Sequence, residues 1–239
     1  MFVVSALAEP VPFRPGERLV FELRWEFIPA GQATLTVMPP SEVAGKPAYH
    51  FVLTARTTAF LDTFYKVRDR IEAFVDPEIT RSLFYRKHQR EGKTRREIEV
   101  RFDWENATAH YTNFGKPRDP LPLMPGTFDP LGAFYFVRTL DLAADMVVER
   151  PVTDGKKNVV GRVRVLERET ITVKGTRYDT YRLAPDLRHV GGVFEESEDA
   201  EMEVWVTADP RHIPVRIQSS VVVGDFIAEL TAMEEVAQP

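Results

Sequence analysis

Residues 16–37, which read GERLVFELRWEFIPAGQATLTV, decide the fold of this chain. Polar and apolar side chains alternate through the first half of the stretch. One face carries Leu19, Phe21, Leu23, Trp25 and Phe27, and the other carries Val20, Glu22, Arg24 and Glu26. This period of two is typical of an antiparallel strand with one buried face. A turn at residues 29–31 then predicts a hairpin, so the stretch indicates a mainly β protein.

The same pattern continues along the chain. Turn signals such as Asp76-Pro77 and Glu91-Gly92 recur about every ten residues, as they do in all-β folds. We therefore expect residues 9–239 to form a single β-barrel-like domain, built as one antiparallel, strongly curved sheet or open β-barrel.

Two short segments break the strand pattern. Asp129 followed by Pro130 has the chemistry of a helix start, because Asp caps free N–H groups and Pro suits the first helical position. Leu131, Phe134 and Tyr135 follow at helical spacing. We expect one central helix at about residues 130–140 and a short helical piece near residues 59–64.

Composition excludes several classes of protein. The 239 residues are 44% hydrophobic, carry a net charge of −5 and include no cysteine. Disulfides and thiolate chemistry are therefore absent, and no basic nucleic-acid module accompanies the local cluster of Lys and Arg at residues 86–96. No apolar run is long enough to span a bilayer. We expect a membrane-proximal protein that does not span the membrane and does not bind nucleic acid.

The first eight residues, MFVVSALA, resemble the end of a signal peptide. Ala6 and Ala8 fit the small-x-small pattern of a signal-peptidase site. We interpret residues 1–8 as a truncated signal-peptide remnant and expect a periplasmic location. The alternative is a frayed N-terminus without function.

Several short motifs, taken in order, resemble one known family. They are Pro15-Gly16-Glu17-Arg18-Leu19 with Trp25, Gly31 and Ala33; Tyr65, Val67 and Asp69; Glu91-Gly92; Asp129-Pro130-Leu131 with Tyr135, Arg138 and Thr139; and Trp205 to Pro214. The chain is similar to an uncharacterised envelope family of Gram-negative bacteria, a domain of unknown function. The resemblance implies a periplasmic, antiparallel β-rich protein and transfers no catalytic residue. The layout is also similar to the half-barrel of periplasmic lipoprotein carriers.

Catalytic and metal-binding motifs are missing from the sequence. The five histidines are scattered without zinc spacing, and neither a Gly-x-Ser-x-Gly elbow nor a phosphate-binding glycine loop occurs. We therefore predict no metal, no cofactor and no enzymatic activity.

Asp69 is the most unusual charged residue in the pattern. It shares a strand face with Val67 and Ile71, so its carboxylate should point inward and need a partner. Arg86, His88 and Arg138 are candidate partners. A structural ion pair between helix and sheet and a polar anchor in a ligand cavity both fit the pattern.

Aromatic residues concentrate on the two helical pieces. A helix over a curved sheet can close an apolar cavity or fill the core, and the sequence leaves both open. The candidate cavity residues are Trp25, Phe60, Phe64, Asp69, Phe134, Tyr135 and Arg138.

These observations predict a non-enzymatic periplasmic protein that binds an apolar ligand, such as a lipid or lipoprotein, or another envelope component. The alternative is a structural or interaction module of envelope assembly with no small ligand. A third hypothesis is a hydrolase that uses carboxylates such as Asp69.

Overall fold

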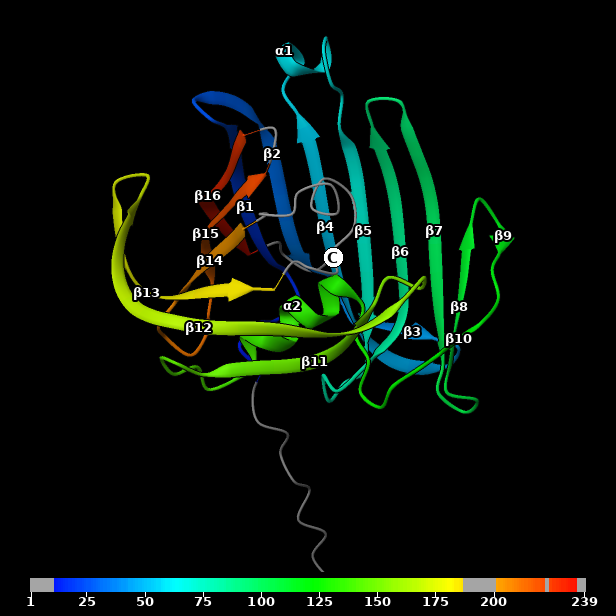
Figure 1. Cartoon of the computed structure of the whole chain (residues 1–239). Coiled ribbons are helices and arrows are strands. Elements are labelled where there is room, and N and C mark those ends of the chain that lie inside the picture. The colour runs from blue at the N-terminus through cyan, green and yellow to red at the C-terminus, as the bar shows by residue number, and fades with distance from the viewer. Residues whose placement is uncertain (1–10, 187–200, 222–223, 236–239) are drawn as a thin grey trace, which may run out of the picture.

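The computed structural model describes residues 11–186, 201–221 and 224–235 (Figure 1). The proposed signal-peptide remnant, residues 1–8, lies outside them. The helices are α1 (Ala59–Asp62) and α2 (Pro130–Arg138). The strands are β1 (Glu17–Trp25), β2 (Ile28–Val37), β3 (Ser41–Val43), β4 (Lys46–Thr57), β5 (Arg68–Val75), β6 (Ser82–Glu91), β7 (Thr94–Asp103), β8 (Thr108–Asn113), β9 (Lys116–Pro117), β10 (Leu121–Pro122), β11 (Val147–Thr153), β12 (Asn158–Val173), β13 (Thr176–Pro185), β14 (Glu201–Thr207), β15 (Pro214–Val221) and β16 (Gly224–Glu235).

The strands of the described residues form one antiparallel sheet. Its order is β10-β8-β7-β6-β5-β4-β2-β1-β16-β15-β14-β13-β12-β11, with β3 beside β4 and β9 beside β8. The first and last strands therefore pair in the middle of the sheet. The sheet curves around α2, and within the described residues its end strands β10 and β11 do not pair with each other (Figure 1). The predicted fold, a strongly curved open sheet with one central helix, is confirmed.

The two ends of the sheet approach each other without closing a ladder. The side chain of Asn158 at the start of β12 donates a hydrogen bond to the carbonyl oxygen of Pro122 on β10. The segment before α2 covers β11: the Phe128 N–H donates to the Pro151 oxygen, and the Thr153 N–H donates to the Phe128 oxygen, each at 2.9 Å. Individual hydrogen bonds, and not a continuous strand ladder, therefore connect the two ends of the sheet.

The opening hairpin differs from its prediction at the turn. Leu19 and Phe21 are buried as expected, but Phe27 is 90% exposed because Glu26 and Phe27 themselves form the turn. Residues 29–31, the predicted turn, lie inside β2. A register shift between Leu23 and Arg24 leaves Ala30 as the extra residue of a bulge, and Pro29 lies next to it, where a residue without an N–H is tolerated. Proline therefore marks the bulge and not the turn.

Helix α2 begins at the cap that the sequence predicted. The Asp129 carboxylate accepts hydrogen bonds at 2.9 Å from the N–H groups of Leu131 and Gly132. Ser82 on β6 donates to the same carboxylate at 2.5 Å and accepts from the Asp129 N–H at 2.8 Å. A Cβ at Gly132 would lie 2.9 Å from the Ser82 hydroxyl, so glycine permits this close approach. The cap therefore fixes the start of α2 against β6.

The other end of α2 is fixed by a buried ion pair. The Arg138 guanidinium is only 1% exposed and lies 2.7 Å from a carboxylate oxygen of Glu17 on β1. It also donates to the Arg211 carbonyl oxygen at 3.2 Å. The predicted ion pair between helix and sheet exists, but its acidic partner is Glu17 and not Asp69.

We expect Arg138→Met to lower the free energy of unfolding by about 3 kcal/mol, because the Glu17 carboxylate would then lack its partner in a largely buried position. For a chain of this size the midpoint of thermal unfolding should fall by about 6–12 °C. The double variant Arg138→Met/Glu17→Met should recover part of the loss. Calorimetry of the three proteins measures this, and a double variant no more stable than Arg138→Met would contradict it.

Candidate functional site

An apolar pocket lies between α2 and strands β11 to β14. Its volume is about 340 Å³, at the lower end of the range of roughly 300–1,000 Å³ for small-molecule sites. Apolar side chains from the helix and the sheet form most of its wall: Ala133, Phe134, Val137, Leu142, Val163, Leu183, Met202 and Val204. We call this site the apolar pocket.

Basic side chains stand at the edge of the apolar pocket. Arg150 and Lys157 are exposed, and within the described part of the chain neither has an acidic side chain at ion-pair distance. The Arg150 guanidinium carbon lies 4.6 Å from the centre of the Phe136 ring, a cation–π contact that holds it beside the wall. Arg162 is different, because it donates to Glu149 at 2.8 Å. The pocket therefore combines an apolar wall with two exposed cations, Arg150 and Lys157, and its lining also includes the carboxylates of Asp154 and Asp186.

His212 is a buried polar group in the pocket wall. Its Nδ1 lies 3.0 Å from the carbonyl oxygen of Arg138, the residue that ends α2. If Nδ1 carries the proton, it donates to this carbonyl and Nε2 is left as an acceptor. His212 thus completes the helix terminus and adds one polar group to the wall.

The two faces of α2 have different roles. Phe134 lines the apolar pocket. The next residue, Tyr135, is fully buried on the other side, with its ring 3.8 Å from that of Phe51 and 5.2 Å from that of Phe13. Helix α2 therefore fills the core with one face and leaves a cavity along the other, so both alternatives from the sequence apply.

The seven residues named from the sequence do not form one site. Phe134 and Arg138 line the apolar pocket, and Tyr135 lies in the core. Trp25 stacks against Phe226 at 6.4 Å between ring centroids, at the end of β1. Phe60 and Phe64 lie on and just after α1, are 64% and 74% exposed, and are not among the residues that line the apolar pocket. Sequence reasoning also missed the wall from β11 to β14, where the valines of residues 159–165 gave the available signal.

Asp69 has a different partner from those predicted. Its carboxylate accepts a hydrogen bond at 2.8 Å from the backbone N–H of Arg90. Arg86 pairs instead with Glu99 at 2.9 Å, and His88 faces Arg70 across the β5–β6 ladder. Burial, followed by the neighbouring Glu91 carboxyl, raises the pKa of Asp69 to about 7. The predicted partners were wrong because strand register, and not proximity in sequence, sets which side chains meet.

The fold and the pocket define a class: a β-rich protein with one open, curved sheet around an internal helix. A scan of family models matches residues 20–231 to the family described as "Protein of unknown function (DUF3108)". This match covers most of the chain, and the chain belongs to that family. The resemblance to a domain of unknown function is therefore confirmed.

One solved structure agrees on the fold. A beta-barrel-like protein of the domain of unknown function DUF1849 from Brucella abortus matches with a TM-score of 0.56 at 10% identity, covering 93% of this chain and 98% of the other. The hypothetical protein CT021 from Chlamydia trachomatis matches with a TM-score of 0.38 at 11% identity, covering 94% of this chain and 90% of the other. A search of curated proteins found no match.

Within the described ranges, none of the helices has the length and apolar character needed to cross a membrane. The same residues contain no group of three or more His, Cys, Asp or Glu side chains placed to hold a metal ion.

We expect Asp69→Asn to be more stable than wild type at pH 8. The folded pKa of about 7 lies above the ordinary value of 3.8, so the stabilising contribution of the protonated form is complete below about pH 4 and is lost as pH rises to about 7. Asparagine keeps a neutral acceptor for the Arg90 N–H. Thermal midpoints between pH 4 and pH 8 measure this effect.

The matched control for this experiment is Asp119→Asn, at an exposed aspartate. Its midpoints should parallel those of the wild type at every pH. If the curve for Asp69→Asn also parallels that of the wild type, the raised pKa of Asp69 is contradicted.

Proposed function

We propose that the chain is an exported, non-enzymatic binding protein that holds the acyl chain of an anionic lipid or fatty acid in the apolar pocket. The observation that carries this proposal is the joint placement of an apolar wall and two exposed cations, Arg150 and Lys157, neither of which has a carboxylate of the described residues at ion-pair distance. An acyl chain would bury its methylenes against Phe134 and Val137, at about 0.8 kcal/mol for each buried CH₂.

The head group of such a ligand would lie at the edge of the pocket. Arg150 is held beside the wall by its contact with Phe136, so its N–H groups are available to a carboxylate or phosphate. An uncharged apolar molecule would use the wall alone. The pocket thus favours amphiphiles with an anionic end.

Export forms part of the same proposal. It is supported by the apolar stretch of residues 1–8, with small residues at Ala6 and Ala8. A lipid-binding protein outside the cytoplasm would also suit the periplasmic expectation drawn from the family resemblance.

The hydrolase hypothesis gains no support from the pocket. Asp69 is not among the residues that line it. Burial raises the pKa of Asp129 to about 6, but this carboxylate is fully buried and is occupied by the cap of α2. Asp69 and Asp129, whose pKa values are raised, both accept hydrogen bonds from backbone N–H groups. We therefore propose binding and not catalysis.

We expect Ala133→Trp to weaken binding of the fluorescent probe 1-N-phenylnaphthylamine at least about tenfold, because Ala133 lies in the wall and the larger side chain would fill the cavity. Arg150→Glu should weaken displacement of the probe by oleate about tenfold while leaving the affinity for the uncharged probe unchanged. Fluorescence titration measures both affinities.

Val147→Ser is the matched control, since Val147 is exposed on β11 outside the pocket wall. It should bind probe and oleate as the wild type does. Native mass spectrometry of protein purified from a Gram-negative periplasm should also show bound lipid. If the wild type binds neither probe nor oleate and carries no lipid, the proposal is overturned.

A further inference from the structure

Four exposed aromatic side chains gather at one end of the sheet. Phe27 in the β1–β2 turn is 90% exposed, and Phe60, Phe64 and Tyr65 on and after α1 are 64%, 74% and 53% exposed. Single exposed apolar residues are common, but a cluster of large ones marks an interaction surface. We call these four residues the aromatic rim. They contribute nothing to the apolar pocket, which lies between α2 and β11 to β14.

The turns that carry the aromatic rim are neighbours in space. The Thr58 N–H, at the start of α1, donates to the Ala30 carbonyl oxygen at 2.9 Å, next to the β1–β2 turn. The Gly92 N–H in the β6–β7 turn donates to the Lys66 carbonyl oxygen at 2.9 Å. Helix α1 therefore lies between two hairpin ends, and it projects beyond the strands at the top of Figure 1.

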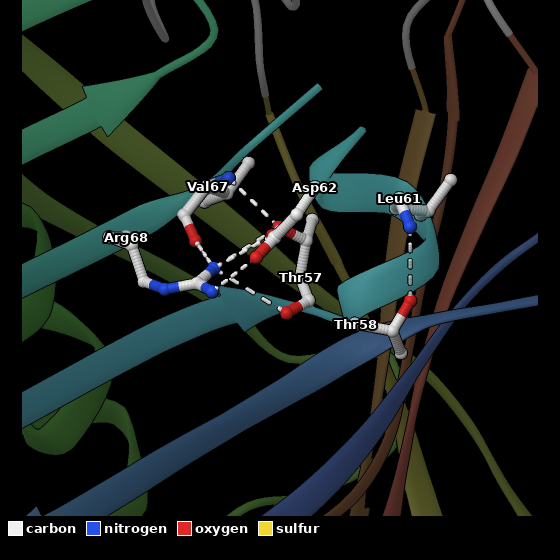
Figure 2. Close-up of polar contacts among 6 residues, drawn as sticks. All are labelled: Thr57, Thr58, Leu61, Asp62, Val67 and Arg68. Atoms are coloured by element: carbon white, nitrogen blue, oxygen red, sulfur yellow. Dashed lines mark hydrogen bonds and ion pairs between the residues drawn. The ribbon is translucent and has the colours of Figure 1, made fainter. Parts of the chain in front are cut away.

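A polar frame holds α1 in place (Figure 2). Arg68 donates to Asp62 at 3.0 Å and 2.5 Å, and Thr57 donates to the same carboxylate at 2.5 Å. The Val67 N–H donates to the Thr57 hydroxyl at 2.9 Å. These polar groups satisfy one another, so the segment is ordered without burying Phe60 or Phe64.

Tyr65 joins the aromatic rim to the β6–β7 turn. A Cβ at Gly92 would lie 2.7 Å from Cε2 of Tyr65, so the ring packs directly on the glycine backbone. Gly92 has a φ of 51°, in the left-handed region that favours glycine. The position of the rim relative to this turn is therefore fixed by packing.

The β6–β7 turn brings a basic patch next to the aromatic rim. It consists of Lys66, Arg90, Lys93, Arg95 and Arg96. In residues 11–186, 201–221 and 224–235, none of these five side chains lies within ion-pair distance of a carboxylate. The nearby Asp62 is neutralised by Arg68, while Asp69 and Glu91 lie together beneath the turn. The basic patch thus carries an excess of positive charge.

We propose that the aromatic rim and the basic patch together form a docking surface for an anionic lipid bilayer. Aromatic rings insert at the headgroup level, and Lys and Arg near the surface attract anionic lipids. The rings project from turn tips and most of the basic side chains follow on the strands below, which suits partial insertion. Binding of a single-stranded nucleic acid would instead need several rings along a basic groove.

Flotation of the full chain with lipid vesicles tests this docking surface. The wild type should float with vesicles of phosphatidylethanolamine and phosphatidylglycerol and should bind at least about tenfold more weakly to pure phosphatidylcholine. Phe60→Ser/Phe64→Ser and Lys93→Glu/Arg95→Glu should each weaken binding to the anionic vesicles at least about tenfold. Phe27→Ser, on a separate turn, should weaken it independently of α1.

Matched controls change equivalent side chains elsewhere on the surface. Val147→Ser/Met233→Ser removes two exposed apolar side chains away from the rim, and Lys46→Glu/Arg177→Glu makes the same change in charge away from the patch. Both control proteins should float as the wild type does. The thermal midpoints of all variants should be close to that of the wild type, because the altered side chains are exposed.

Three results would overturn the proposal. One is the absence of wild-type binding to anionic vesicles. Another is an equal loss of binding in the rim variants and their controls. The third is binding to a single-stranded oligonucleotide that competes with vesicles and does not depend on Phe60 and Phe64. Because the aromatic rim is separate from the apolar pocket, loss of probe binding in Ala133→Trp would leave vesicle binding unchanged.

Discussion

A buried arginine holds together three parts of this molecule that are far apart in the sequence. Arg138 at the end of α2 contacts Glu17 on the first strand and the carbonyl of Arg211 between β14 and β15. Desolvating a guanidinium costs several kcal/mol, so it stays buried only while these partners are in position. The helix, the first strand and the late hairpin consequently depend on one another. The ion pair therefore connects the helix inside the curved sheet to β1, a strand at its centre.

Helix α2 separates the interior into a packed core on one side and the apolar pocket on the other. The face that includes Tyr135 packs against Phe13 and Phe51 in the largest hydrophobic cluster of the described residues. The face that includes Phe134 leaves space against β11 to β14. A complete barrel would fix the second region by strand pairing. In this open sheet, the width of the pocket depends instead on the contacts of one short helix, α2.

Features that depend on neighbouring residues in the chain could be predicted from the sequence. Side-chain contacts that depend on the register between strands could not. Asp129-Pro130 predicted the start of α2 because a capping carboxylate and a first-turn proline act within one helical turn. The alternation around Leu19 and Phe21 predicted the buried face in the same way.

The partner of Asp69 could not be predicted, since it depends on how β5 lies against β6. Glu17 and Arg138 are 121 residues apart, and no pattern in the chain connects them. The exposure of Phe60 likewise accompanies the polar frame around Asp62, whose partners Thr57 and Arg68 meet because β4 pairs with β5.

The segment that caps α2 also protects the sheet from self-association. An open sheet has two edges, and a bare edge strand can pair with another copy and start aggregation. Phe128 occupies part of the β11 edge through two backbone hydrogen bonds, and Pro151 in that strand has no N–H to offer. At the opposite edge, β10 is two residues long and includes Pro122. Displacement of α2 would therefore expose the edge of β11 to other copies of the chain. The position of the helix thus affects solubility as well as stability.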